Sequence, residues 1–184
     1  LCLFFSCSDK NDIRIDVSKI NIDFLIKRYE VDFYESTKET LPKVKEKYPY
    51  LFPKEFTDSL AIIKVNDKQE QELFAETQNI YENFSFVEKQ ISSLFKHIKY
   101  YNPTFNPPNV ITMITNIDYE NRVIYSDSLL LISLDVYLGK NHPFYGDYPK
   151  YIKENNSKDH IVVDAAKAII DQQVYQSINR DFIS

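Results

Sequence analysis

The chain has 184 residues, of which 43% are hydrophobic and 27% charged, a composition typical of one globular domain and unlike that of a disordered chain. Its net charge is −5, and its basic residues are scattered along the sequence. This charge argues against nucleic-acid binding driven by attraction to phosphates.

The first segment has the order of a bacterial signal peptide that ends in a lipobox. Leu1 to Phe5 are apolar, Ser6 is small, and Cys7 opens the polar run 8–12. Lipobox processing needs a small residue before the cysteine, and the thiol then carries diacylglycerol. We expect residues 1–6 to be a signal-peptide remnant, 7–12 a lipidated tether, and Cys7 the lipidation site. The alternative is an ordinary hydrophobic N-terminus or an expression scar.

Cysteine content and hydrophobicity are consistent with an exported, lipid-anchored protein. Cys2 leaves with the signal and Cys7 is acylated, so no thiol remains for a disulfide. After Phe5 no run approaches the 18 or so apolar residues of a membrane-spanning helix. Membrane attachment then depends on acyl chains, which contribute about 0.8 kcal/mol per buried methylene.

The first half of the chain alternates between strand and helix patterns. Apolar residues alternate over 13–17 and again over 20–26, which predicts one or two strands, and 28–34 is expected to be a turn or short helix. A helix is expected over 37–48, with Pro42 tolerated near its start. Asn66 or Asp67 caps the next helix, which extends to Phe84. Ser85, with Glu88 three residues on, opens a strongly amphipathic helix up to Tyr101.

The second half predicts a small sheet followed by a long helix. Strands are expected over 110–114, 122–125 and 129–134, the last two joined in a hairpin through 126–128. A short helix follows Asp147. The helix expected over 157–178 is apolar on nearly every face, which predicts that the domain encloses it. Because Ser184 follows soon after, we expect a single α+β domain over 13–184, with a small antiparallel sheet packed against helices and a truncated C-terminal end.

The stretch from Tyr100 to Ala168 carries a family resemblance. The ordered segments are Val110-Ile111-Thr112, Asp118-Tyr119-Glu120-Asn121, the run from Val123 to Ile132, Asp135-Val136-Tyr137-Leu138-Gly139, His142-Pro143-Phe144-Tyr145 and Tyr148-Pro149-Lys150-Tyr151-Ile152. Together they resemble the gliding-motility lipoprotein GldB family of the Bacteroidota. The resemblance implies a cell-envelope lipoprotein needed for gliding and linked to type IX secretion, with no established enzymatic activity. We expect the periplasmic face of a membrane as its location.

The order of strand, hairpin, loop and apolar helix is also distantly similar to the core of zinc peptidases, in which that helix carries H-E-x-x-H. The motif is absent here, because the helix reads Asp164-Ala165-Ala166-Lys167-Ala168. Asp164 and Lys167, three apart, could instead pair within the helix. His160 and Asp164, four apart, could bind zinc only with a third ligand such as Asp135 or His142. A lipid-anchored metallopeptidase-like hydrolase is therefore the alternative function.

Other catalytic patterns are missing. The two isolated glycines cannot form a phosphate loop, and no Gly-x-Ser-x-Gly elbow is present. The carboxylates Asp118, Glu120, Asp127 and Asp135 are expected to form turns and surface charges. We predict no catalytic residue, no metal and no cofactor.

The aromatic residues suggest a further alternative. The chain has 14 Tyr and 13 Phe, several of them clustered in 48–53 and 142–149. Most are expected in the core, and the rest could form an adhesive patch, because tyrosine is enriched at protein interfaces. A non-catalytic lipoprotein acting through protein partners is the expected function, and a peptide- or glycan-binding lipoprotein is the other alternative.

Overall fold

The predicted hairpin forms one half of a four-stranded sheet with the order β1-β2-β4-β3. The computed structural model describes residues 15–126 and 128–181, with side chains up to residue 173. Its strands are β1 (Ile26–Arg28), β2 (Asn109–Met113), β3 (Val123–Ser126) and β4 (Leu129–Ser133). The three strands predicted in the second half are confirmed to within about one residue.

The prediction of an antiparallel sheet is wrong, because only β3 and β4 run antiparallel. β1 pairs parallel with β2, and β2 pairs parallel with β4. Strand β4 lies between β2 and its hairpin partner β3. The chain reverses direction between β2 and β3 and again between β3 and β4, so β4 runs parallel to β2. The link from β1 to β2 contains α1 to α5, which satisfies the need of parallel strands for a long crossover. The coarser prediction of an α+β domain with a small sheet is confirmed.

The alternating segment 13–26 contributes only its end to the sheet. Residues 13 and 14 lie outside the described part, and β1 begins at Ile26. Between them the chain makes a turn and an extended run in which Ile20, Ile22 and Phe24 are half-buried and their neighbours exposed. The period-2 pattern therefore predicted which side chains face the core. An extended segment can alternate in this way without pairing with a neighbouring strand, so the pattern did not predict where the strand begins.

The helices agree with the predictions in most places. They are α1 (Tyr29–Tyr34), α2 (Leu41–Lys47), α3 (Asp58–Val65), α4 (Lys68–Tyr81), α5 (Ser85–Tyr101), α6 (Lys150–Lys153) and α7 (His160–Asp181), with short 3-10 turns η1 (Pro49–Leu51), η2 (Leu134–Val136) and η3 (Pro143–Tyr145). Asp67 caps α4 by accepting hydrogen bonds from the backbone N–H groups of Gln69 and Glu70, at 2.9 and 3.0 Å. Helix α3, which Thr57 caps, was not predicted from the sequence.

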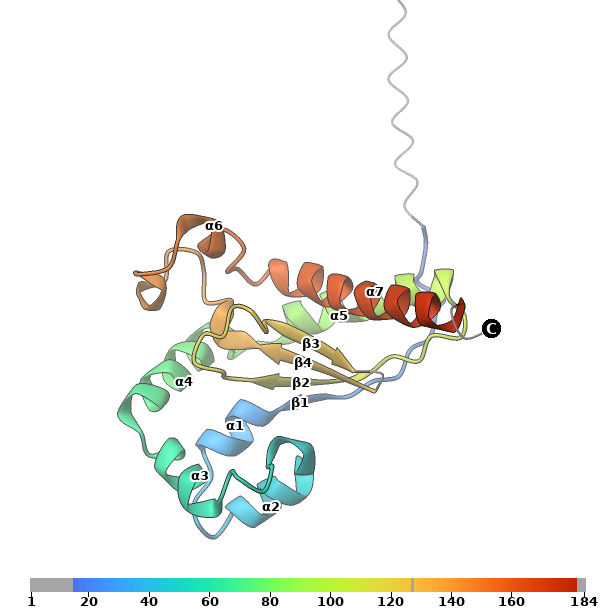
Figure 1. Cartoon of the computed structure of the whole chain (residues 1–184). Coiled ribbons are helices and arrows are strands. Elements are labelled where there is room, and N and C mark those ends of the chain that lie inside the picture. The colour runs from blue at the N-terminus through green and yellow to red at the C-terminus, as the bar shows by residue number, and fades with distance from the viewer. Residues whose placement is uncertain (1–14, 127, 182–184) are drawn as a thin grey trace, which may run out of the picture.

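Helix α7 is not enclosed, contrary to the prediction from its composition. Ile161, Ala165 and Ile169 form its buried stripe, at positions i, i+4 and i+8. Val163 and Ile170 are 56% and 54% exposed on another face. Figure 1 shows α5 and α7 along one face of the sheet and α1, α2 and α3 on the other side. The domain therefore covers only the stripe of α7 that contains Ala165, and the rest of the helix surface is not enclosed.

The direction of the parallel strands gives the domain two distinct ends. In Figure 1 the strands β1, β2 and β4 end on the side of α1 and α4, while the described chain begins beside the opposite end of the sheet. Polar side chains that follow the strands therefore meet at one end, away from the start of the chain.

Candidate functional site

Three buried carboxylates lie near the carboxyl ends of the parallel strands. Glu30 stands in the first turn of α1, directly after β1, and Asp135 stands in η2, directly after β4. Glu70, near the start of α4, reaches the loop that follows β2. Glu30 and Asp135 are 0% exposed and Glu70 is 8% exposed. We call Glu30, Glu70 and Asp135 the carboxyl-edge cluster, since parallel strands bring their carboxyl ends to the same edge of a sheet.

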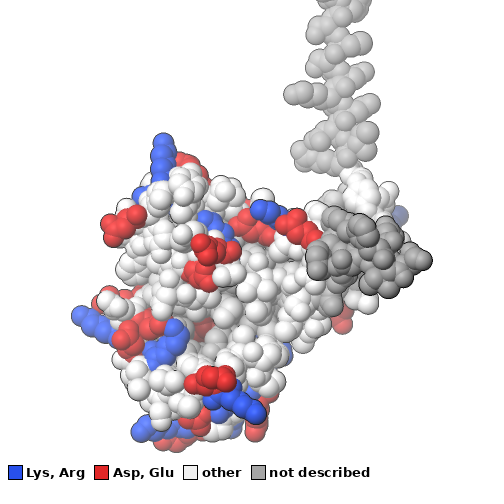
Figure 2. Space-filling model, viewed as in Figure 1, with Lys and Arg blue, Asp and Glu red and all other residues white. Residues whose placement is uncertain are grey.

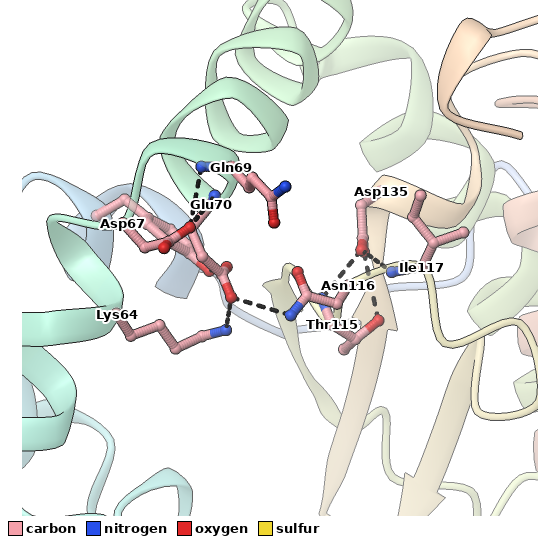
Figure 3. Close-up of polar contacts among 9 residues, drawn as sticks. Lys64, Asp67, Gln69, Glu70, Thr115, Asn116, Ile117 and Asp135 are labelled. Carbon is pink, nitrogen blue, oxygen red and sulfur yellow. Dashed lines mark hydrogen bonds and ion pairs between the residues drawn. The ribbon is translucent and has the colours of Figure 1, made fainter.

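Asp135 ties the loop after β2 to the end of β4. Its Oδ2 accepts hydrogen bonds from the backbone N–H groups of Thr115, at 3.1 Å, and Ile117, at 2.6 Å (Figure 3). Its Oδ1 lies 3.4 Å from the Thr115 hydroxyl. Burial raises the pKa of Asp135 to about 6, although these backbone hydrogen bonds act in the opposite direction.

The loop held by Asp135 has an unusual backbone. Asn116 and Ile117 have φ angles of 58° and 59°, in the left-handed region that residues with a Cβ rarely adopt. A β-branched residue such as Ile117 is especially disfavoured there, at a cost of about 1–3 kcal/mol. The two N–H groups that reach Asp135 Oδ2 are those of Thr115 and Ile117, on either side of Asn116, so the carboxylate stabilises the strained conformation.

Glu70 holds the same loop from the side of α4. Its carboxylate accepts hydrogen bonds from Lys64 and, at 2.9 Å, from the Asn116 side-chain amide (Figure 3). It also accepts one of 2.5 Å from the Tyr34 hydroxyl. Burial alone would raise the pKa of Glu70, but the hydrogen bonds from Lys64, Tyr34 and Asn116 outweigh it and lower the pKa. Glu70 therefore joins α1, α3 and α4 to the loop after β2.

Replacing Tyr34 by phenylalanine tests this junction. The substitution keeps the buried ring and removes one donor to a charged group, so we expect the free energy of unfolding to fall by about 1.5–3 kcal/mol. Tyr29→Phe is the matched control, because Tyr29 lies in the same aromatic cluster and its hydroxyl makes no hydrogen bond to another described residue. Urea unfolding followed by circular dichroism gives both values. Equal losses in the two variants would contradict the assigned role of the hydroxyl.

Glu30 completes the cluster from the side of β1. It accepts a hydrogen bond from the Arg28 guanidinium and one of 2.6 Å from the Thr112 hydroxyl. Arg28 also donates to the Tyr81 carbonyl, at 3.1 Å, and stacks over the Phe84 ring. The ion pair thus joins β1, β2 and the end of α4 around one buried charge.

The chemistry of the cluster is that of structural support. Each of its carboxylate oxygens has at least one hydrogen-bond donor from the protein. A pocket of about 270 Å³ lies beside the loop and is lined in part by Gln69, Asn116, Ile117 and Phe144. The strained loop therefore forms one wall of a small surface pocket, and the carboxylates lie behind that wall.

The residues weighed as zinc ligands make separate contacts. Asp164 Oδ2 accepts a hydrogen bond of 2.7 Å from the Tyr137 hydroxyl, and it makes no ion pair with Lys167 among the described residues. His160 Nδ1 lies 3.0 Å from the Ser157 hydroxyl, and His142 Nε2 lies 3.4 Å from a carboxylate oxygen of Glu76. Within 15–126 and 128–173, no three His, Cys, Asp or Glu side chains are grouped as a metal site.

Other predicted residues have mixed outcomes. Asp118 forms a turn by accepting the N–H groups of Glu120 and Asn121, as expected. Asp135 was expected at the surface and is instead fully buried, because β4 leads it into the core. Asp127 and Cys7 lie outside the described residues. Across the described part of the chain, no helix is long and apolar enough to cross a membrane.

One groove brings together a tyrosine of the loop before β3 and a tyrosine of α6. It has a volume of about 680 Å³ and lies between the start of β3, α6 and α7, with Tyr119, Arg122, Tyr151, Asp164 and Lys167 in its lining. Tyr151 is 77% exposed and Tyr119 is 36% exposed. The Arg122 guanidinium is fixed by the carbonyls of Tyr119 and Ile152, at 3.1 and 3.0 Å. We call this surface the α6–α7 groove.

Glu30 and Glu70 were not predicted from the sequence as site residues. Asp135 directly follows a predicted strand, whereas Glu30 lies four positions after the end of the predicted strand segment 13–26. Neither position indicates a shared edge of the sheet unless the strands are known to run parallel. Nothing in the local sequence marks Glu70 as buried. A glutamate three positions after the cap residue Asp67 is also typical of a solvated capping box.

The fold and cluster define a small mixed α+β domain braced by buried ion pairs, with an open groove on α7. Residues 10–184 match the family model of the gliding motility protein GldB, named as a lipoprotein family. The chain belongs to this family of gliding-motility lipoproteins, which assigns it a role in gliding motility. No curated protein and no solved structure gave a significant match.

Proposed function

We propose that this chain is a non-catalytic lipoprotein of the cell envelope, anchored through Cys7, that serves gliding and the linked type IX secretion by binding other proteins. It lies on the periplasmic face of a membrane in a Bacteroidota cell, after removal of a signal peptide. Its sheet, hairpin and final helix form a distantly peptidase-like core without the metal motif. Membership of the GldB family over residues 10–184 is the observation that carries the proposal.

The contacts of the carboxyl-edge cluster support a non-catalytic role. A catalytic carboxylate needs an oxygen within hydrogen-bond reach of a substrate. Here Glu30 and Asp135 are 0% exposed, and protein donors engage their oxygens. Such carboxylates stabilise the fold rather than meet a ligand.

The exposed side chains of the α6–α7 groove support binding to a protein partner. Tyr151 is 77% exposed and Tyr119 is 36% exposed, and both line this groove. Aromatic residues and arginine are enriched where proteins bind each other, and Arg122 lies in the same groove. In the view of Figure 2, acidic and basic side chains are interspersed, so this face favours a partner of mixed character over a polyanion.

Anchoring is tested by replacing Cys7 with serine in the gliding host. We expect Cys7→Ser to leave the membrane fraction and to abolish gliding, because one serine hydroxyl cannot replace the acylated thiol. Cys2→Ser is the matched control and should retain both properties. Fractionation with immunodetection and colony spreading measure the two effects. A Cys7→Ser protein that remains membrane-bound would contradict the anchor.

The interaction and the absence of catalysis need separate tests. Tyr151→Ala should reduce the recovery of envelope partners with the acylated, solubilised protein, while Tyr50→Ala, an exposed tyrosine near α2, should not.

For the metallopeptidase alternative, the full-length protein is analysed for metal. Stoichiometric zinc that disappears in His160→Ala would overturn the non-catalytic assignment.

A further inference from the structure

The start of the described chain lies against the outer side of α5. Residues Ile15 to Ser18 form a groove of about 700 Å³ together with a row of α5 side chains that extends to Lys96. Phe24 contacts the Phe95 ring edge-on, with centroids 5.0 Å apart. In Figure 1 this first segment leaves the domain beside the C-terminal end of α5. The position from which the chain departs is therefore fixed by packing.

Two tyrosines stand at that end of α5. Tyr100 and Tyr101 are 50% and 71% exposed, and their rings contact each other edge-on with centroids 5.1 Å apart. Neither hydroxyl makes a hydrogen bond to another described residue. Exposed tyrosines with an apolar ring and a free hydroxyl are the side chains that proteins place at the level of lipid headgroups.

The distance to the anchor is short. Eight residue steps separate Cys7 from Ile15, and a fully extended chain spans at most about 3.6 Å per step, so Ile15 lies within about 30 Å of the acylated residue. A Cys7 anchor would therefore hold the domain from the end at which the described chain begins, beside Tyr100 and Tyr101. Helices α1, α4 and α6, which contribute residues to the carboxyl-edge cluster and to the α6–α7 groove, lie toward the other end of the sheet (Figure 1).

Charge adds little to this arrangement. Lys89 and Lys96 line the groove beside Ile15, but Asp16 and Glu88 line it too. Two positive and two negative side chains leave no net attraction to anionic lipid. Contact with the bilayer therefore depends on the aromatic side chains and the tether.

We propose that the end of the domain that carries Tyr100 and Tyr101 rests on the headgroups of the membrane that holds the Cys7 anchor, with the α6–α7 groove facing away from the bilayer. This inference rests on the lipid anchor of the proposed function. The tether keeps the local lipid concentration high, so two interfacial side chains suffice to orient the domain. The groove is then accessible to partners in the aqueous space.

The absence of tryptophan from the sequence allows a direct test. Tyr101→Trp places a single fluorophore at the proposed contact, and Tyr151→Trp places one at the groove as the matched control. Acylated variants of this chain are bound to vesicles of phosphatidylethanolamine, phosphatidylglycerol and phosphatidylcholine with brominated acyl chains. We expect bromine to reduce the indole fluorescence of the Tyr101→Trp variant by about half and that of the Tyr151→Trp variant hardly at all, because interfacial side chains reach the acyl boundary. Added salt should not reverse the quenching.

The outcomes separate the two proposals. Stronger quenching in the Tyr151→Trp variant, or none in either variant while the protein floats with the vesicles, overturns the orientation but leaves the anchor intact. Failure of the acylated protein to float with the vesicles removes the anchor, and the orientation with it. Addition of Tyr100→Ser to Tyr101→Trp should weaken the quenching, and unchanged quenching would show that the tyrosine pair is not the contact. Circular dichroism confirms that the variants are folded.

Discussion

Replacing Arg28 by methionine is expected to lower the free energy of unfolding by about 3–5 kcal/mol, the typical cost of leaving a buried charge without its partner. Glu30 is 0% exposed, and after the substitution only the Thr112 hydroxyl would remain to stabilise its carboxylate. Arg28 also donates to Tyr81 and Gln78, so the link between β1 and α4 is lost as well. Denaturant unfolding followed by circular dichroism measures the loss.

Two further variants identify the cause of this loss. Adding Glu30→Gln to Arg28→Met removes the unpaired charge, so we expect the double variant to be more stable than Arg28→Met alone. Lys45→Met breaks an exposed ion pair with Asp58 and should change stability by no more than about 0.5 kcal/mol. If Arg28→Met costs no more than Lys45→Met, the buried pair does not hold the fold as described.

Replacing Asp135 by asparagine is expected to remove a pH dependence of stability. The pKa of Asp135 is about 6 in the folded protein, above its ordinary value of 3.8, because burial disfavours the charged form. The folded state therefore binds this proton more tightly than the unfolded state. The contribution of Asp135 to stability is fully present below about pH 4 and is lost as the pH rises to about 6, a decrease of about 3 kcal/mol.

The comparison is made as the difference in unfolding free energy between wild type and Asp135→Asn, measured from pH 4 to 7 so that the other titrating groups cancel. Asparagine has one acceptor oxygen, and its amide would face one of the N–H groups of Thr115 or Ile117. We expect a cost of about 1–3 kcal/mol at neutral pH and a larger cost near pH 4. Asp118→Asn is the control, because the hydrogen bonds of Asn121 lower the pKa of that exposed carboxylate. A pH-independent difference for Asp135→Asn would contradict the raised pKa.

The helices and the hairpin could be predicted because their signals are local. Asp67 before α4, the apolar period of α5 and the short link after Ser126 each act within a few residues. The resemblance to the GldB family was also readable from ordered sequence segments, and the family match over residues 10–184 confirms it. Local patterns do not report strand direction, so the sheet was wrongly predicted as antiparallel.

The burial of polar residues was predicted least well. The hydrogen-bond partners of Glu30, Glu70 and Asp135 are distant in the sequence: Thr112, Asn116 and Thr115 lie 82, 46 and 20 positions away. Only the parallel arrangement of β1, β2 and β4 brings these groups to one edge. Similarly, the composition of α7 indicated enclosure, but the fold covers only the stripe around Ala165.

The amino-acid sequence by itself determined the α+β class, most helix boundaries, the β3–β4 hairpin and the family, because each depends on neighbouring residues or on their order. The tertiary structure decided the parallel pairing, the carboxyl-edge cluster, the exposed face of α7 and the position of the α5 tyrosines beside the start of the chain. These features depend on which distant segments meet, and the free energy of those contacts depends on burial, which no local pattern specifies.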